Sequence, residues 1–390
     1  MVVSAAKKED MVRRLSLLFS DRLWGWVDHP PTSQVIENIL KENFNDEELQ
    51  ALSDIPLKPL PLEFVPLGEI AARSKFPRAR LEKILDGIVA RGLLFSGKTK
   101  EGEKGYAVLR MAFGFTQAFY WKGTMDAHAR KMAELETDPL FIKAKLGMYT
   151  SLDTKPFRYI PMTEAIDPQW QNVYPTETIE RVINDASRFA VAHCPCRVKY
   201  ELVNGKGCGH SKDVCLKLDE LADCLIDTGL AKEISREEAL AVIKRADEEG
   251  LVHYTENTAE HIQTICNCCG CACWSVGPIR RRLVPRDLIM ATYFLRLTSE
   301  EDCTGCGDCI EICPVDAVRM EDDVARVDLD WCIGCGVCIS RCPTKAIRLV
   351  EKTDKPRQTK DFAELFTKVT EERTSVVEAR ERPRKTQEKE

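Results

Sequence analysis

The chain has 390 residues, a formal net charge of −6 and 18 cysteines. Its length predicts two or three domains with apolar cores, and its acidic balance argues against general affinity for nucleic acid. It contains no run of about 18 apolar residues, so no membrane span is expected, and its start does not have the pattern of a secretory signal. So many cysteines without a secretory signal predict a protein of the reducing cytoplasm.

Residues 65–110 carry the most regular pattern outside the cysteine clusters. The segments VPLGEIAARS and ARLEKILDGIVARGLL predict two amphipathic helices, and LLFSGKTKEGEKGYAVLR predicts a hairpin with a Gly- and Lys-rich tip. This order resembles a winged helix, so residues 1–120 are predicted to form a winged-helix-like domain. Residues 62–110 hold ten Lys or Arg against six Asp or Glu. That excess is small for a DNA reader and favours protein contact or dimerisation over DNA binding.

Residues 121–296 are predicted to form a Cys-rich, mainly helical domain that binds metal. Five thiols within eight residues, without apolar periodicity, are poor core material, and clustered thiols in a reducing compartment indicate metal ligation. A helix is expected where Ser235 precedes Glu238 by three residues, as in a capping box. The candidate ligands are the ten cysteines of this region: Cys194, Cys196, Cys208, Cys215, Cys224, Cys266, Cys268, Cys269, Cys271 and Cys273.

The metal of this central region is expected to be one or two further [4Fe–4S] clusters, because soft thiolates suit iron–sulfur chemistry. Zinc is the alternative at one site, since His193, His210 and His261 lie near these cysteines and zinc accepts mixed Cys and His ligands. The sequence does not pair the ligands. The simplest arrangement joins the HCPCR segment at 193–197 to the CNCCGCAC segment at 266–273. The composition of CNCCGCACW resembles Cys-rich regions in electron-transfer proteins of anaerobes.

A basic run, IRRRLVPR, follows at 279–286. It predicts either a solvated turn or a docking site for an acidic partner.

The C-terminal side contains two copies of the pattern CxxCxxCxxxCP, namely CTGCGDCIEICP at 303–314 and CIGCGVCISRCP at 332–343. Three thiolates two residues apart can bind three corners of a cubane cluster. Both copies resemble the bacterial two-cluster ferredoxin family, over residues 297–350. That resemblance implies a compact α+β domain with two [4Fe–4S] clusters, in which each run supplies its fourth cysteine to the other cluster. The implied ligand sets are Cys303, Cys306, Cys309 and Cys342 for one cluster, and Cys332, Cys335, Cys338 and Cys313 for the other.

The chain is therefore expected to be an α+β multidomain protein that ends in a charged tail at 351–390. The predicted function is an iron–sulfur electron-transfer protein that passes single electrons between a redox donor and a partner oxidoreductase of anaerobic-type metabolism. Two alternatives stay open: an oxidoreductase subunit with a catalytic central cluster, and a redox-sensing winged-helix regulator. A protein redox partner is expected, and a homo-oligomer is compatible with the sequence. No GxGxxG or P-loop motif indicates a nucleotide-dependent activity.

Overall fold

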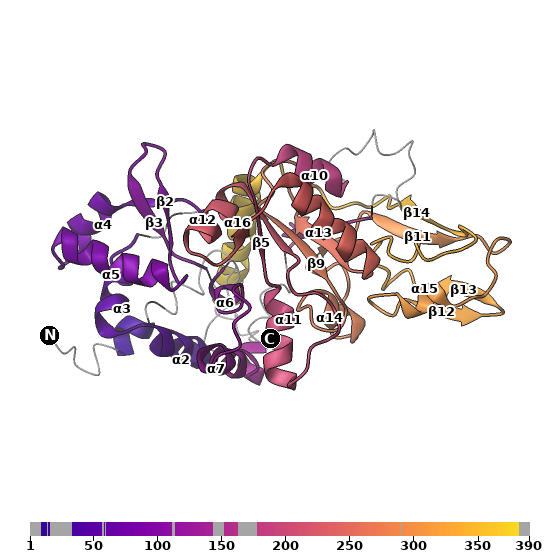
Figure 1. Cartoon of the computed structure of the whole chain (residues 1–390), viewed down its shortest axis with the longest axis horizontal. Helices are drawn as coiled ribbons and strands as arrows, with labels where there is room; N and C mark the ends of the chain where they lie inside the picture. The colour runs from indigo at the N-terminus through magenta and orange to yellow at the C-terminus, as the bar shows by residue number, and fades with distance from the viewer. Residues whose placement is uncertain are drawn as a thin grey trace, which may run out of the picture.

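The computed structural model describes residues 9–13, 15, 33–56, 58, 60–110, 114–142, 152–162, 178–288 and 290–381. The described part is elongated: the N-terminal helices and hairpin lie at one end, the largest sheet lies in the middle, and the strands of the C-terminal cysteine runs lie at the other end (Figure 1). None of its helices has the length and apolar content needed to cross a bilayer.

The N-terminal region combines helices with a small antiparallel sheet of strand order β1-β3-β2. Asn45 caps α3 in a capping box: its side chain accepts from the Glu48 backbone N–H at 3.0 Å, and the Glu48 carboxylate accepts from the Asn45 N–H at 2.9 Å. The elements are α2 (Ser33–Asn43), α3 (Asp46–Ser53), β1 (Val65–Pro66), α4 (Leu67–Arg73), α5 (Arg78–Ala90), β2 (Phe95–Lys98), β3 (Lys104–Ala107), α6 (Phe115–Ala118) and α7 (Ala127–Glu136).

The expected order of two helices and a hairpin is present as α4, α5 and the β2–β3 pair. Helix α5 turns Leu81, Leu85 and Ile88 into the core, where each fully buried aliphatic side chain contributes about 1.5–3 kcal/mol to folding. The assignment of this region to the winged-helix class stays a prediction.

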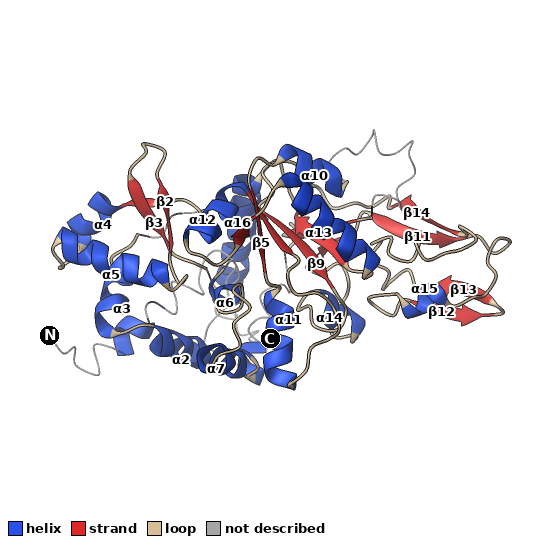
Figure 2. Cartoon of the chain, in the orientation of Figure 1, coloured by secondary structure: helices blue, strands red, loops and turns tan. Residues whose placement is uncertain are grey.

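The central region is built on a seven-stranded sheet of order β10-β4-β8-β9-β6-β5-β7, antiparallel except where β10 meets β4. The expectation of a mainly helical domain missed this sheet (Figure 2). Its strands have two to five residues, and two of them, Cys215–Leu218 and Thr264–Cys268, carry thiols in place of a simple apolar alternation. The strands are β4 (Phe157–Ile160), β5 (Phe189–Ala192), β6 (Cys215–Leu218), β7 (Lys232–Glu233), β8 (Val252–Glu256), β9 (Thr264–Cys268) and β10 (Met290–Ala291).

In the described part of the central region, five helices accompany this sheet. The expected capping box of α13 is confirmed, because Ser235 accepts from the Glu238 N–H at 3.2 Å and donates its own N–H to the Glu238 carboxylate at 2.7 Å. The helices are α10 (Ile179–Asp185), α11 (Pro195–Asn204), α12 (Asp219–Asp227), α13 (Arg236–Glu248) and α14 (Val276–Arg280).

The C-terminal cysteine runs lie between two antiparallel strand pairs, β11–β14 and β12–β13. The last described helix, α16, turns Leu365, Phe366 and Val369 into the core, and Thr359 just before it bridges to Thr258 of the central region. The elements are β11 (Phe294–Thr298), α15 (Asp308–Glu311), β12 (Val318–Glu321), β13 (Val324–Val327), β14 (Ile347–Glu351) and α16 (Phe362–Glu381).

The basic run at 279–286 joins the central region to the C-terminal cysteine runs. Arg280 donates to Asp316 at 2.8 Å. Arg282 donates to the Val315 carbonyl at 2.7 Å and lies 4.4 Å from the centre of the Trp331 ring. The run forms a turn whose Arg281, Arg282 and Leu283 are exposed, as the solvated-turn interpretation expects, while Arg280 and Arg282 also bind groups of the C-terminal region. Docking of an acidic partner at this run stays a prediction.

Gly270 lies at the same junction, within the cysteine segment that follows β9. A Cβ atom at this position would stand 1.9 Å from the carbonyl oxygen of Pro314 and 2.9 Å from Cδ of Arg280. Since a backbone atom cannot yield as a side-chain tip can, the close approach of the two regions requires glycine here.

The variant Gly270→Ala is expected to destabilise the protein by about 1–3 kcal/mol, because the added methyl group overpacks this junction. Gly68→Ala is the matched control: nothing lies within 4 Å of its added Cβ, and alanine in a helix gains about 0.5–1 kcal/mol over glycine. Anaerobic thermal unfolding measures both. Equal melting temperatures for Gly270→Ala and the parent protein would contradict the tight junction.

Candidate metal centres

All eighteen cysteines are free thiols, and they fall into four groups plus one isolated thiol. The first group lines a small cavity at the far end of the C-terminal region, where β13 and the two cysteine runs meet. Cys303 accepts from the Ala325 backbone N–H at 3.5 Å, and hydrogen bonds from the Ala325 and Gly305 N–H groups lower the pKa of its thiol. Its members are Cys303, Cys306, Cys309 and Cys342.

The second group lines a neighbouring cavity and is more enclosed. Burial raises the pKa of Cys338 to about 12, and Cys313 accepts from the Ala317 N–H at 3.3 Å. Its members are Cys313, Cys332, Cys335 and Cys338. Each cavity thus combines three thiols of one run with the last thiol of the other, and four thiolates form the donor set of a [4Fe–4S] site.

Arg296 lines both of these cavities and is almost completely buried, with 2% of its surface exposed. Its Nη2 donates to Cys309 Sγ at 3.3 Å and its Nε donates to Thr298 at 3.1 Å. Burial alone would lower the pKa of this guanidinium, but the Cys338 and Cys309 thiols outweigh burial and the net pKa is raised. The buried guanidinium of Arg296 therefore lies beside both four-thiol groups.

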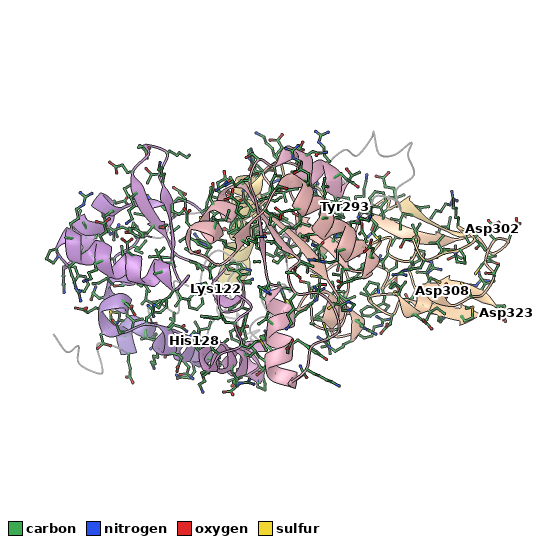
Figure 3. The ribbon with its side chains drawn as sticks, in the orientation of Figure 1. Lys122, His128, Tyr293, Asp302, Asp308 and Asp323 are labelled. Atoms are coloured by element: carbon green, nitrogen blue, oxygen red, sulfur yellow. The ribbon has the colours of Figure 1, made fainter. Side chains whose placement is uncertain are left out.

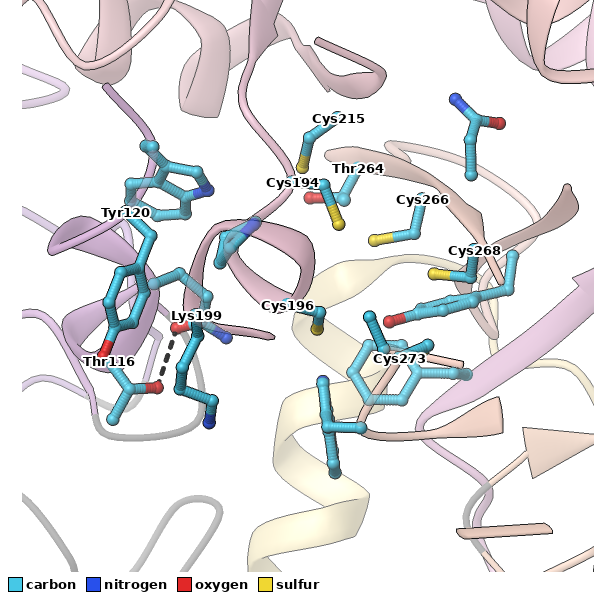
Figure 4. A pocket seen from close by; sticks show the side chains of 18 of the residues that line it. Thr116, Tyr120, Cys194, Cys196, Lys199, Cys215, Thr264, Cys266, Cys268 and Cys273 are labelled. Carbon is cyan, nitrogen blue, oxygen red and sulfur yellow. Dashed lines mark hydrogen bonds between the residues drawn. The ribbon is translucent and has the colours of Figure 1, made fainter. Parts of the chain in front are cut away.

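The third group surrounds a cavity of about 340 Å³ in the central region. Figure 4 shows its thiols gathered around a common space, together with Tyr120 and Lys199. Neighbouring thiols interact in sequence around this space, from Cys194 to Cys196, Cys273, Cys268, Cys266 and Cys215. We call the cavity that these six thiols line the six-thiol cavity.

Local structure explains how distant segments reach this cavity. Cys194 is the N-cap of α11 and Cys196 lies in its first turn, so both thiols are at the positive end of the helix dipole. Cys266 and Cys268 are two residues apart on β9 and therefore share one face of the sheet. Cys273 accepts from two backbone N–H groups, those of Ser275 and Val276, each at 3.4 Å.

The electrostatics of the six-thiol cavity single out one thiol. Hydrogen bonds to neighbouring thiols and burial raise the pKa values of Cys194, Cys215 and Cys268, and burial first of all raises that of Cys273. Hydrogen bonds from Cys215 and Cys268 lower the pKa of Cys266 well below its ordinary value, and the thiolate is the metal-binding form. The Lys217 ammonium is buried next to this thiol: burial would lower its pKa, but Cys215, Cys266 and Glu256 outweigh burial and raise it. Lys217 also lies 5.2 Å from the centre of the Trp121 ring.

The remaining four central cysteines do not face this cavity. Cys208, Cys269 and Cys271 form a separate group. Cys224 lies on α12, outside both thiol groups of the central region; burial, followed by Asp227 and Asp223 of the same helix, raises its thiol pKa to about 12. The ten candidate ligands thus divide into six, three and one.

The three histidines that were considered as zinc ligands do not belong to the three-thiol group, and two of them lie against oxygen atoms instead. His193 Nδ1 lies 3.3 Å from the Trp121 carbonyl oxygen, and His210 Nδ1 lies 3.7 Å from the Glu249 carboxylate. His261 is exposed. Among the described residues, the close group of side chains in the central region that could hold a metal ion consists of thiols alone, those of Cys208, Cys269 and Cys271.

The sequence analysis missed the buried cations beside the thiols. Lys217 interrupts the apolar strand CLKL and Arg296 interrupts FLRLT. A lone basic residue in an otherwise apolar strand is the signal that would have indicated them, because a buried charge requires a partner.

Residues 297–343 match the family model described as a 4Fe-4S dicluster domain. This part of the chain is therefore a ferredoxin-like iron–sulfur domain, and it contains all eight cysteines of the two four-thiol groups. No curated protein and no solved structure matches the chain.

The variant Arg296→Met is expected to make the iron–sulfur reduction potentials more negative, since a buried positive charge stabilises the more negative reduced state. Arg319→Met is the control, because Arg319 is exposed and pairs with Glu321 at 2.6 Å. Redox titration followed by electron paramagnetic resonance measures both. Equal shifts for the two variants would contradict the role of Arg296.

Proposed function

We propose that this chain is an iron–sulfur electron-transfer protein that carries single electrons between a donor and a partner oxidoreductase of anaerobic-type metabolism. Two [4Fe–4S] clusters would be held by the two four-thiol cavities and one more by four thiols of the six-thiol cavity. The ligand sets would be Cys303, Cys306, Cys309 and Cys342, then Cys313, Cys332, Cys335 and Cys338, then four of Cys194, Cys196, Cys215, Cys266, Cys268 and Cys273. The observation that carries the proposal is the convergence of thiols at three adjoining cavities.

The contact between the central region and the dicluster domain supports a continuous path. Tyr159, on β4, is buried, and the thiols of both Cys273 and Cys335 act on it. Close by, the Met162 N–H donates to the Cys335 carbonyl at 3.2 Å. Tyr159 therefore interacts with thiols of the six-thiol cavity and of the second four-thiol cavity, while Arg296 lines both four-thiol cavities.

The side chains around the cavities have two roles in this proposal. Arg296 and Lys217 stabilise negative charge as it builds up on reduction. Cys335 and four of the six central thiols are buried, and low solvent exposure is one of the factors that set cluster potentials. The four are Cys194, Cys215, Cys268 and Cys273.

The end of the dicluster domain farthest from the central sheet is the proposed docking site for the redox partner. Cys306, in the first four-thiol group, is the exposed member of the cysteines. Asp302, Asp308 and Asp323 are exposed around it, and Figure 3 shows them at this end of the molecule. An acidic rim of this kind favours a partner with a basic surface.

Reductive titration of the anaerobically purified protein is expected to take up about three electrons per chain, one for each [4Fe–4S] cluster. The reduced protein should show broadened electron paramagnetic resonance signals from magnetic interaction between adjoining centres. An uptake of about two electrons would remove the central cavity from the electron path.

The double variant Asp302→Asn and Asp323→Asn is expected to reduce a basic acceptor such as cytochrome c several-fold more slowly at low salt. The difference should vanish at high salt, where charge steering is screened. Asparagine also tolerates the positive φ of 58° at position 323. The control is Asp185→Asn on α10, in the central region. Equal slowing by the control would contradict docking at this end.

A catalytic central cluster is the second candidate, and the size of the six-thiol cavity favours it. The cavity volume of about 340 Å³ lies in the range of small-molecule sites, and Tyr120, Glu136 and Lys199 line it beside the thiols. Tyr120 donates to Glu136 at 2.9 Å, and Lys199 donates to the same carboxylate at 3.0 Å. A change in the paramagnetic spectrum of the central centre on addition of a small substrate would support this candidate over simple transfer.

The redox-sensing regulator has less support. Some of the basic residues of the proposed winged helix pair with acidic side chains: Arg80 with Glu47 at 2.5 Å and Lys104 with Asp86 at 2.8 Å. A domain that binds phosphates needs such cations to face outward without acidic partners. Retarded migration of duplex DNA at low salt, in either redox state, would revive the regulator.

A further inference from the structure

We infer that Cys208, Cys269 and Cys271 form a separate site for one soft divalent metal ion of the zinc type, with a fourth position open to an exogenous ligand. This site is independent of the proposed electron path, because none of its thiols lines the six-thiol cavity or the two dicluster cavities.

The spacing of the sulfur atoms indicates a single ion. All three Sγ atoms lie within 4.8 Å of one another, and those of Cys208 and Cys269 are 4.0 Å apart. Tetrahedral zinc with Zn–S distances of about 2.3 Å holds its sulfur ligands roughly 3.8 Å apart. A cubane separates its thiolates further, because each one binds a different iron at a different corner.

Strand geometry separates this site from the six-thiol cavity. Successive side chains of a strand point to opposite faces. Cys266 and Cys268 share the face of β9 that lines the cavity, and the strand ends at Cys268; Cys269, the next residue, lies outside the cavity lining and is grouped with Cys271 and Cys208. The segment CNCCGCAC therefore supplies two different sites: Cys266, Cys268 and Cys273 line the six-thiol cavity, whereas Cys269 and Cys271 belong to the three-thiol group.

The third thiol comes from the loop that follows α11, and α13 fixes that loop. The Ser211 N–H donates to the Glu249 carboxylate at 2.9 Å, and Arg245 donates to the Asp213 carbonyl at 2.7 Å. Cys208 is thereby held against Cys269 before any ion binds, a preorganised arrangement that favours metal binding.

Arg197 completes the charge balance. It is 1% exposed, donates to the Asn267 carbonyl at 2.9 Å, and interacts with Cys269. Three thiolates with one divalent ion carry a single net negative charge, which the guanidinium neutralises. A neutral ligand such as water in the fourth position leaves the site uncharged, so a neutral donor is favoured there.

The open position follows from the donor count and from exposure. The group holds three donors among the described residues, whereas a structural zinc site has four protein ligands. Cys208 and Cys271 are both partly exposed, so solvent reaches this side of the site. Three protein ligands with an accessible fourth position are the arrangement of zinc sites that bind or activate a small molecule.

Metal analysis of the full-length protein, purified without oxygen, tests the site. The parent protein is expected to hold about one zinc per chain. Cys208→Ala and Cys271→Ala should each lose most of that zinc and keep the parent's iron content. Cys224→Ala, which removes an isolated thiol, should keep both. Absence of zinc from the parent, unchanged zinc in both site variants, or a loss of about four irons in either one would overturn the inference.

Cobalt substitution of the parent protein tests the open position without any variant. Cobalt(II) at a three-thiolate site gives visible bands that depend on the fourth ligand. Added imidazole is expected to shift these bands in a saturable manner. Bands that stay unchanged at saturating imidazole would overturn the open position.

Discussion

Concentrating thiolates in a protein interior has a high electrostatic cost, and the arrangement of this chain follows from offsetting that cost. Each thiol group has a buried cation beside it: Arg296 lies between the two dicluster cavities, Lys217 lies at the six-thiol cavity, and Arg197 interacts with Cys194 of the six-thiol cavity and Cys269 of the three-thiol site. All three cations are at most 5% exposed. Without a thiolate partner, a buried Lys or Arg would be strongly destabilising. The cations and the thiols therefore depend on one another, and both depend on the strands that hold them.

The second four-thiol cavity is the place where the parts of the molecule meet. Tyr159 connects it with the six-thiol cavity, and Gly270 lies against Pro314 next to Cys313. Arg280 lies between the two regions and pairs with Asp316. The basic run thus positions the dicluster domain relative to the central sheet. This junction brings the central region and the dicluster domain together and leaves the acidic end of the dicluster domain, the proposed docking site, exposed.

The dicluster domain could be predicted from the sequence because its ligand spacing is local and repeated, and the family match over residues 297–343 supports it. The central sheet could not, since its short strands carry cysteine and lysine where apolar alternation would indicate a strand. The division of ten thiols into six, three and one depends on pairing between distant strands, on which the sequence carries no local signal. Cys224 illustrates this limit: the sequence groups it with the other nine central cysteines, whereas it lies on α12 outside the six-thiol cavity and the three-thiol group, and its role as a ligand stays a prediction. The winged-helix assignment and the cluster ligand sets stay predictions.

The most direct test of the account is the iron and acid-labile sulfide content of the anaerobically purified chain. The account predicts about twelve of each per chain, which corresponds to two clusters in the dicluster domain and one in the six-thiol cavity. A value of about eight would contradict it, because the six-thiol cavity would then hold no iron–sulfur cluster.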